Sequence, residues 1–458
     1  MANLPAEYTR RMQALLGNDF DSYLASFDTA PQKALHVNRS IISPEAFERL
    51  ADFEIRGLPY YRGGYTFREE GLGNHPYHHA GMFYIQEPSA MSPVAAVDIE
   101  PHWRALDLCA APGGKSSQLA MAVPEGLLVS NDPAMSRCRI LTGNIERMGY
   151  RHVVTACLDV SAFSKSCAGY FDLTLADAPC SGEGMFRKDE GAIREWSPGL
   201  VEKCALRQRE ILEHAKRTLR PGGHLIYSTC TFSLQENEMN VLRFLQDNPA
   251  FSLVPCKEEV VRATSPGIDL PGSGGIDLSL CRRFYPFGNH SGEGQFIAVM
   301  RKRDDGGAEP HPAAGQQARE DLSAADRKIA HAFLRDTLTG FDEEAVFRKG
   351  QTIRYFEPDF TPDFPMFSCG VNLGTVENGR FKPAHQLFSA MGGSFVRTIC
   401  LDRNDERLAR YLRGETIPCG GVPDGWTAVL VDGVPLGGAK VVGGVAKNHY
   451  PKGLRVLG

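Results

Sequence analysis

Short apolar runs that suit buried β-strands alternate with helical patterns between residues 103 and 302, and this alternation restricts the fold more than any other feature. Right-handed crossovers between such strands place the connecting helices on both faces of one parallel sheet. We therefore predict an α/β fold with a doubly wound sheet in this part of the chain. The predicted strands are 104–108, 127–131, 153–158, 172–176 and 224–228, followed by 251–255 and 295–300.

The flanking segments have different patterns. Residues 1–100 predict an α+β extension, with helical spacing over 4–27, a short strand at 34–40 and another helix that begins near Ser43. Residues 303–320 are rich in Gly, Pro, Ala and charged side chains, as linkers are. After the linker, Ser323 can cap a helix, and short β-like runs then alternate with glycine turns up to residue 458. We predict four parts: 1–100, 101–302, the linker 303–320, and a small β-rich region, 321–458.

The composition of the chain limits the cellular compartment and the kinds of partner that we expect for the protein. The chain of 458 residues carries a formal net charge of −5, so a local basic groove is expected rather than a wholly basic surface. Its twelve cysteines show no CxxC spacing, which predicts neither a metal site nor a disulfide framework. The chain has no signal-like apolar segment and no run of ~18 apolar residues, so we expect a cytoplasmic protein without membrane contact.

A glycine-containing turn follows the first predicted strand of the sheet, in LDLCAAPGGKSSQLA at 106–120. Glycines let backbone amides approach a ligand closely, and the start of the following helix is electropositive. The turn is neither GxGxxG nor a P-loop, which disfavours a nucleoside triphosphate. It predicts a cofactor-binding loop of another kind.

Carboxylates follow the next three strands. Asp132 suits the hydroxyl groups of a ribose, Asp159 could accept a hydrogen bond from an adenine amine, and Asp177 ends the fourth strand. A single aspartate at the end of a strand is more often a turn or helix cap. Because the carboxyl ends of parallel strands meet at one edge, the acids and the glycine loop together predict a nucleoside-type site.

Cysteines come after two of these strands. Cys180 lies three residues beyond Asp177 in DAPC, and Cys230 ends STC. A free cysteine is usually an apolar core residue, but the neighbouring motifs place these two at a ligand. Thiolate addition to carbon 6 of a cytosine would make carbon 5 nucleophilic toward a sulfonium methyl, with Asp177 at the edge of the base. A second residue must help to remove the carbon-5 proton, and these residues alone do not decide which cysteine has which role.

The same stretches resemble the Nop/Sun family of S-adenosylmethionine-dependent RNA cytosine-5 methyltransferases. The resemblance rests on LDLCAAPGGKSSQLA, the Asn131-Asp132 pair, ADAPCSGEGMFRKD and GGHLIYSTCTFSLQENE, and on YIQEPSAMSP at 84–93. GEGQFIAVMRK and the closing KNHYPKGLR are similar to the bacterial ribosomal small-subunit methyltransferase F group within that family. The chain departs from the family at His36, where relatives often carry Arg.

The resemblance implies a Rossmann-like methyltransferase domain at 101–302 between an RNA-binding extension at 1–100 and a PUA-like RNA-binding region at 321–458. It implies that Cys230 is the covalent nucleophile, that Cys180 assists release, and that Asp177 borders both the cofactor and the base. The residues implied for S-adenosylmethionine are Cys109, Ala110, Ala111, Pro112, Gly113, Gly114, Lys115, Asp132, Arg137, Asp159 and Asp177.

RNA, most simply small-subunit ribosomal RNA, is the expected partner of a monomeric enzyme that needs no metal. The catalytic residues leave open the same chemistry on transfer RNA, and a ribosome-assembly factor that binds RNA without catalysis is a further alternative. Arg187 and Lys188 either hold a phosphate or form a solvated loop. The tail after residue 435 suits RNA docking through Lys440, Lys447, His449, Tyr450, Lys452 and Arg455.

Overall fold

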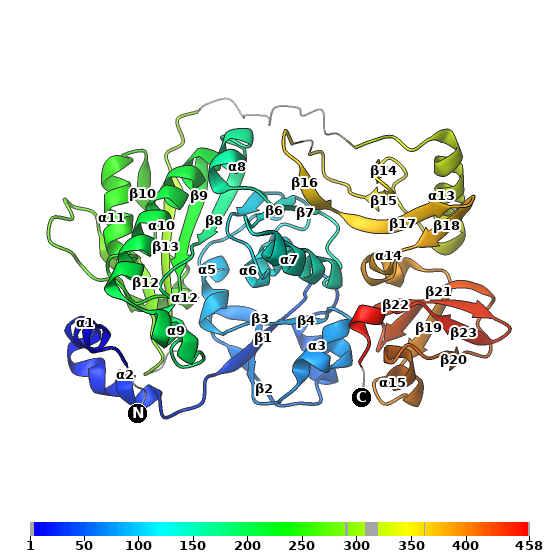
Figure 1. Ribbon diagram of the computed structural model, residues 1–458, viewed down its shortest axis with the longest axis horizontal. Helices are drawn as coiled ribbons and strands as arrows, with labels where there is room; N and C mark the ends of the chain where they lie inside the picture. Colours follow the sequence, from blue (N-terminus) through cyan, green and yellow to red (C-terminus); the bar gives the residue numbers. More distant parts are fainter. Residues whose placement is uncertain (1–3, 289–291, 307–318, 361, 457–458) are drawn as a thin grey trace.

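The computed structural model describes residues 4–288, 292–306, 319–360 and 362–456; most of the predicted linker, residues 307–318, lies outside them. Its centre is a ten-stranded sheet in the order β11-β12-β13-β9-β8-β5-β6-β7-β16, with β10 paired to β13 (Figure 1). The neighbours among β5 to β9 are parallel. The predicted α/β fold is confirmed. The parallel strands are β5 (Arg104–Asp107), β6 (Leu127–Asn131), β7 (Val153–Ala156), β8 (Phe171–Asp177) and β9 (Leu219–Thr229).

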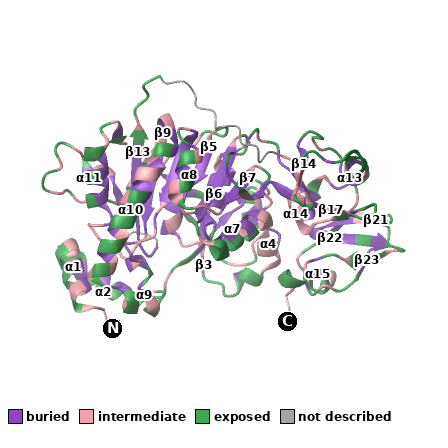
Figure 2. Cartoon of the chain, turned by 45° about the horizontal axis from the view of Figure 1, so that its top comes forward, coloured by how far each residue is buried: buried purple, intermediate pink, exposed green. Residues whose placement is uncertain are grey.

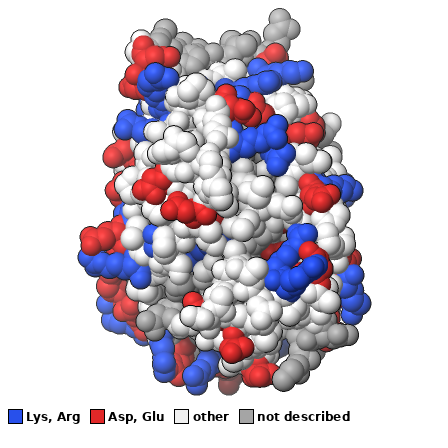
Figure 3. Space-filling view, turned by 90° about the vertical axis from the view of Figure 1, so that its left-hand side faces the viewer, with Lys and Arg blue, Asp and Glu red and all other residues white. Residues whose placement is uncertain are grey.

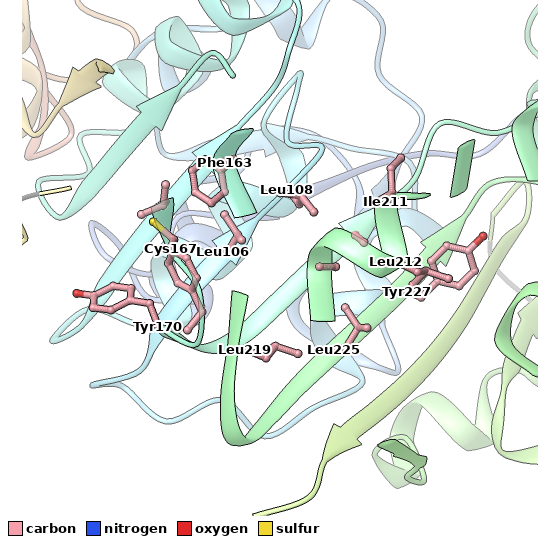
Figure 4. Close-up of a cluster of buried hydrophobic side chains, with 14 of the residues drawn as sticks. Leu106, Leu108, Phe163, Cys167, Tyr170, Ile211, Leu212, Leu219, Leu225 and Tyr227 are labelled. Carbon is pink, nitrogen blue, oxygen red and sulfur yellow. The ribbon is translucent and has the colours of Figure 1, made fainter. Parts of the chain in front are cut away.

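Helices cover both faces of this sheet, and successive residues of a strand pack against the helical layers on opposite faces. Leu106 of β5 packs in a cluster with Phe163 and Ile211, whereas its neighbour Ala105 joins the opposite cluster with Leu119 (Figure 4). The strands are buried and the helices expose their outer sides (Figure 2). One layer contains α8 (Val160–Ser166), α10 (Pro198–Thr218) and α11 (Glu238–Asp247), and the other contains α5 (Ser92–Ala95), α6 (Gly114–Ala122), α7 (Met135–Arg147) and α12 (Glu258–Arg262).

The later strands extend the sheet with antiparallel pairing. β13 (Gln295–Lys302) lies antiparallel to β9 and carries β10 (Phe251–Leu253) and β12 (Arg282–Phe284), which in turn pairs with β11 (Ser265–Pro266). β9 begins at Leu219, five residues before the predicted start, so that Pro221, Gly222 and Gly223 lie within the strand and not before it. A short helix, α9 (Glu190–Glu195), precedes α10.

The described N-terminal segment begins with two helices, α1 and α2, and then forms a separate antiparallel sheet in the order β2-β3-β1-β4, with two further short helices, α3 and α4, between its strands. The helical pattern over 4–27 is divided by Gly17, whose φ of +53° favours glycine. Ser43 caps its helix by accepting a hydrogen bond from the backbone nitrogen of Ala46. The elements are α1 (Ala6–Leu16), α2 (Phe20–Ser26), β1 (Lys33–Val37), α3 (Pro44–Leu50), β2 (Ile55–Leu58), β3 (Tyr61–Phe67), α4 (Pro76–His79) and β4 (Phe83–Ile85).

The C-terminal segment is β-rich, as predicted, and contains two small sheets. Their orders are β14-β15-β17-β18 and β19-β21-β22-β23-β20. Ser323 caps α13, and β16 leaves this segment to pair with β7 of the central sheet. The elements are α13 (Ala324–Thr337), β14 (Val346–Lys349), β15 (Thr352–Tyr355), β16 (Met366–Cys369), β17 (Val371–Glu377), β18 (Arg380–Pro383), α14 (His385–Met391), β19 (Thr398–Leu401), α15 (Glu406–Leu412), β20 (Ile417–Pro418), β21 (Gly425–Val431), β22 (Val434–Val442) and β23 (Val445–Asn448).

Side chains of one charge do not form a continuous patch on the face seen in Figure 3. Lysines and arginines are interspersed there with acidic residues around a largely uncharged area. Within the described part of the chain, no helix is both long enough and apolar enough to span a bilayer.

Candidate active site

A cavity of about 680 Å³ lies where the parallel strands end. Strand order changes direction at β5, between β6 on one side and β8 on the other, and open α/β sheets bind ligands in the crevice at such a point. The cavity therefore lies where the strand-end motifs predict a site. Its lining includes Cys109, Ala111, Asp132, Pro133, Ala134, Arg137, Asp159, Val160, Asp177, Cys180, Arg207, His214 and Cys230.

The turn from β5 to α6 borders this cavity through Cys109 and Ala111. Gly113 has a φ of +114°, which suits glycine, and a Cβ atom on Gly114 would lie 3.0 Å from the side chain of Gln86. The backbone conformation therefore favours glycine at residue 113, and the close approach of the Gln86 side chain favours it at residue 114. Ala110, Pro112, Gly113 and Gly114 shape the turn without being among the residues that line the cavity.

The acids after β6 and β7 line one side of the cavity. Asp132 pairs with Arg137 at 3.3 Å, and the Arg137 guanidinium also donates to the carbonyl oxygen of Ala111 at 2.7 Å. Asp159 caps α8 by accepting from the backbone nitrogen of Ser161 at 2.9 Å. Hydrogen bonds from the Ser161 side chain and backbone lower the pKa of Asp159, so its carboxyl is ionised at neutral pH.

Asp177 is the most highly connected acid of the site. Its Oδ2 accepts from Lys115 Nζ at 2.8 Å, and its Oδ1 accepts from Ser228 Oγ at 2.6 Å and from Gln295 Nε2 at 3.3 Å. Burial lowers the pKa of Lys115, but the Asp177 carboxylate outweighs it and the net shift is upward. Lys115 is therefore a cation that holds the carboxylate in place. The motifs STC and GEGQF contain Ser228 and Gln295, yet only the folded chain shows their shared partner.

Cys180 and Cys230 come together at the ends of β8 and β9. These strands are neighbours in which Asp177 lies opposite Ser228, so the residues that follow both strands meet at one edge. The two sulfur atoms are 3.3 Å apart, and both side chains line the cavity. The hydrogen bond with Cys230 and burial raise the pKa of Cys180. Burial and the nearby acids also raise the pKa of Cys109, which keeps that residue a neutral thiol.

Arg187, the first of the two basic residues after the PC motif, is not free to hold a phosphate. Arg187 donates to the carbonyl oxygens of Ser26 and Thr29 and pairs with the buried carboxylate of Glu293 at 2.8 Å. Its guanidinium therefore attaches the N-terminal helices to the core, and the phosphate-binding interpretation of Arg187 is wrong. Lys188 is exposed.

Tyr450, predicted to support RNA docking, and His36, where the chain departs from the family, are both buried. Tyr450 is buried, and its hydroxyl is 3.0 Å from His79 Nδ1, so it cannot stack on a base. His36 is fully buried, with Nε2 3.0 Å from Ser117 Oγ. Lys440, Lys447 and Lys452 remain exposed in the tail. Among the described residues, no three His, Cys, Asp or Glu side chains are grouped to hold a metal ion.

The doubly wound sheet with its strand-end cavity is Rossmann-like, and comparison with known proteins assigns it to the methyltransferases of this fold. A family model described as 16S rRNA methyltransferase RsmB/F matches residues 94–301. Models of the N-terminal domain of 16S rRNA methyltransferase RsmF and of the methyltransferase RsmF PUA domain match residues 4–88 and 398–456.

Relatives match along nearly the whole chain. Ribosomal RNA small subunit methyltransferase F of Cronobacter sakazakii is 31% identical, over 96% of this chain and 93% of the relative. The protein of that name from Shewanella sp. strain MR-4 is 31% identical, over 95% of this chain and 93% of the relative. The chain belongs to the ribosomal RNA small subunit methyltransferase F family.

Solved structures agree with this fold. A methyltransferase homologue from Pyrococcus horikoshii is 28% identical with a TM-score of 0.57, covering 66% of this chain and 96% of that one. NSun6 from the same organism, solved with SFG, is 21% identical with a TM-score of 0.55, covering 66% of this chain and 99% of that one.

Proposed function

We propose that the protein transfers a methyl group from S-adenosylmethionine to carbon 5 of a cytosine in RNA, and that small-subunit ribosomal RNA is the substrate. The observation that carries the proposal is the 3.3 Å approach of the Cys180 and Cys230 sulfur atoms at the cavity lined by Cys109, Asp132 and Asp159. A protein that only binds RNA needs neither a thiol pair nor this set of acids. Membership of the family supports ribosomal RNA over transfer RNA.

The cavity suits S-adenosylmethionine by size and chemistry. Asp132 and Asp159 offer carboxylate acceptors to a ribose and an adenine amine, and the turn at Cys109 and Ala111 brings backbone close to the cavity. About 680 Å³ is within the usual range for pockets that enclose a ligand of this size. When bound, the cofactor supplies an electrophilic sulfonium methyl. The residues that would hold it are the 109–115 loop, Asp132, Arg137 and Asp159.

Cys230 is the nucleophile in this proposal, and Cys180 assists. The Cys230 thiolate adds to carbon 6 of cytosine, and the electron pair of the 5,6 double bond moves toward carbon 5, which then takes the methyl group. A base then takes the carbon-5 proton, the electron pair of that C–H bond restores the 5,6 double bond, and the Cys230 sulfur leaves as a thiolate. Cys180, whose sulfur lies 3.3 Å from that of Cys230, is placed to act as this base in its thiolate form and becomes a thiol when it accepts the proton. The raised pKa of Cys180 makes its thiolate a good proton acceptor.

Asp177 and Lys115 orient the base. The carboxylate can accept a hydrogen bond from the amino group of cytosine, which a uracil lacks, and Lys115 and Ser228 fix its two oxygen atoms. Fixed donors and acceptors lower the reorganisation needed at the moment of reaction. We also propose that residues 1–100 and 321–458 bind the RNA that surrounds the target.

The roles of the two cysteines are tested by substitution in the full chain with ribosomal RNA and S-adenosylmethionine. Cys180→Ala should accumulate a covalent protein–RNA adduct, because release is impaired. Cys230→Ala should form no adduct and no 5-methylcytosine. Cys204→Ala removes a half-buried thiol of α10 and serves as the matched control. An adduct that persists in Cys230→Ala would overturn the assignment, and bisulfite mapping of the RNA would identify the methylated cytosine.

A further inference from the structure

Glu236 is a buried acid that the chemistry described above does not use. It lies in the turn between β9 and α11, its side chain is 0% exposed, and it is not among the residues that line the cavity. Its Oε2 accepts from the backbone nitrogen of Ser181 at 3.0 Å and from Gln208 Nε2 at 2.8 Å. Its Oε1 accepts from Ser181 Oγ at 2.5 Å and from Thr231 Oγ1 at 3.3 Å.

The partners of this carboxylate are the neighbours of the two cysteines. Ser181 follows Cys180 in the chain, and Thr231 follows Cys230. The hydroxyl groups of Ser181 and Thr231 are themselves 2.9 Å apart. Gln208 also donates to the carbonyl oxygen of Pro179, the residue before Cys180, at 3.0 Å. One side chain therefore connects the loops that carry both thiols.

Other groups of the same turn also form hydrogen bonds with the chain around Cys230. Asn237 accepts from Thr229 Oγ1 at 2.6 Å and donates to the carbonyl oxygen of Thr231 at 2.8 Å, so it binds the chain on both sides of Cys230. The backbone carbonyl of Glu236 accepts from the Tyr227 hydroxyl at 2.5 Å. The position of Cys230 is thus set by the turn that contains Glu236 as well as by β9.

Hydrogen-bond donors surround the carboxyl group of Glu236. The backbone nitrogen of Ser181, the Gln208 amide and two hydroxyl groups donate to it, and hydrogen bonds to a charged group are stronger than those between neutral groups. Burial nevertheless raises its pKa to about 7, which reflects the cost of keeping a charge away from water. Buried acids with shifted pKa values are concentrated at functional sites.

We propose that Glu236 is a positioning residue that holds the thiols of Cys180 and Cys230 at reacting distance. The inference rests on the proposed function for its catalytic consequence, but the thiol geometry can be measured without RNA. Small displacements of reacting groups are costly, since a shift of about 1 Å can lower a rate about a hundredfold. The carboxylate acts through the cysteine loops and contacts neither the cavity nor its ligands.

The first test measures the distance between the thiols chemically. In the full chain without RNA, diamide should oxidise Cys180 and Cys230 to an intramolecular disulfide, each thiol losing one proton and one electron to the reagent. Glu236→Gln places an amide group against the donors of Ser181 or Gln208, and we expect its disulfide to form at least about tenfold more slowly. Glu146→Gln is the matched control, because Glu146 is also an acid of raised pKa but bonds to Gln386, away from the cysteines.

The second test separates positioning from a general loss of structure. We expect kcat for methyl transfer to fall about tenfold to a hundredfold in Glu236→Gln, while the KM for RNA and the affinity for S-adenosylmethionine stay unchanged. Glu236→Asp retains the charge and should recover part of both rates. Should Glu236→Gln fail to fold, the pair Ser181→Ala and Thr231→Val removes hydroxyl donors while the carboxylate stays, and should show the same two effects more weakly.

The outcomes distinguish this inference from the proposed function. A normal disulfide rate in the folded Glu236→Gln variant overturns the positioning role, whatever its kcat. A slow disulfide rate in a protein that forms no 5-methylcytosine under any condition would retain the positioning role and overturn the proposed function. Equal losses in Glu146→Gln would show that a half-buried acid away from the cysteines has the same effect, and would also overturn the inference.

Discussion

Cys369 of β16 lies opposite Val154 of β7, so a strand from the C-terminal segment covers the outer edge of the central sheet. The chain that leads to β16 contributes to the core beside it. Phe364 and Phe360 pack their rings 5.1 Å and 5.5 Å from those of Phe163 and Tyr170. The C-terminal segment is thus part of the structure that supports the side of the cavity lined by Asp159 and Val160.

A chain that ends at residue 320 is therefore expected to be less stable than the full protein. Its β7 would become an exposed edge strand, and Phe163 and Tyr170 would lose their aromatic partners, which favours association between molecules. Urea unfolding and light scattering of the two chains would measure this. Equal unfolding midpoints would show that β16 contributes nothing to the sheet. Loss of RNA binding in such a truncation would not by itself locate the RNA surface.

Glu238 and Arg283 form an ion pair that is almost completely buried, with side chains 0% and 1% exposed. Arg283 Nε donates to Glu238 Oε1 at 2.6 Å, and its Nη1 donates to the carbonyl oxygen of Phe232 at 3.0 Å. Glu238→Gln leaves the guanidinium without its counter-charge, so we expect the free energy of unfolding to fall by about 3–5 kcal/mol. Urea titration measures this loss.

The exposed pair of Arg262 and Glu258 provides the control for that experiment. Arg262→Met should change the free energy of unfolding by less than about 1 kcal/mol, because solvent screens exposed pairs. A loss of similar size in Arg262→Met and Glu238→Gln would contradict the account of the buried pair.

We expect the buried His36 to make the fold less stable in acid. Burial, together with Arg39 and Arg147, lowers its pKa from 6.5 to about 3. The unfolded chain therefore binds a proton that the folded chain excludes, and the stability this histidine contributes is complete above pH 6.5 and is lost as the pH falls toward 3. The free energy of unfolding is expected to change by about 1.4 kcal/mol per pH unit in this range. Urea unfolding of His36→Gln between pH 7 and 4, as approximate limits, should show a flatter dependence; an unchanged slope would contradict it.

The sequence predicts the parallel strands and the strand-end residues well, because both follow from local patterns. Short apolar runs that end in Asp132, Asp177 or Cys230 place those side chains at one edge of a parallel sheet without knowledge of any distant contact. By contrast, β16 is a short run whose pairing with β7 depends on an edge far away in the chain. No local pattern distinguishes it from the neighbouring strands of the C-terminal segment.

Contacts between side chains that are far apart in the chain could not be predicted from the sequence. Arg187 is a residue type that commonly binds phosphate, but the carboxylate of Glu293 neutralises its charge. Glu293 lies in a loop that comes near Arg187 only in the folded chain. Ser228, Gln295 and Glu236 sit in recognisable motifs, yet their roles follow from hydrogen bonds to Asp177 and Ser181. Burial of Tyr450 against His79 likewise requires the N-terminal segment to be in place.

The paired lysines of the C-terminal sheet offer a sharper test of RNA docking than truncation. Lys440 of β22 lies directly opposite Lys447 of β23, and both are exposed. Like charges in this arrangement repel one another, so a phosphate between them would be stabilising. We expect Lys440→Glu with Lys447→Glu to weaken RNA binding and to lower the salt slope by about 1–2, because each phosphate contact contributes about 0.7–0.9. Lys382→Glu is the control, since Lys382 already pairs with Glu377 on the other small sheet. A salt slope that is identical in all three proteins would exclude these lysines from the RNA interface.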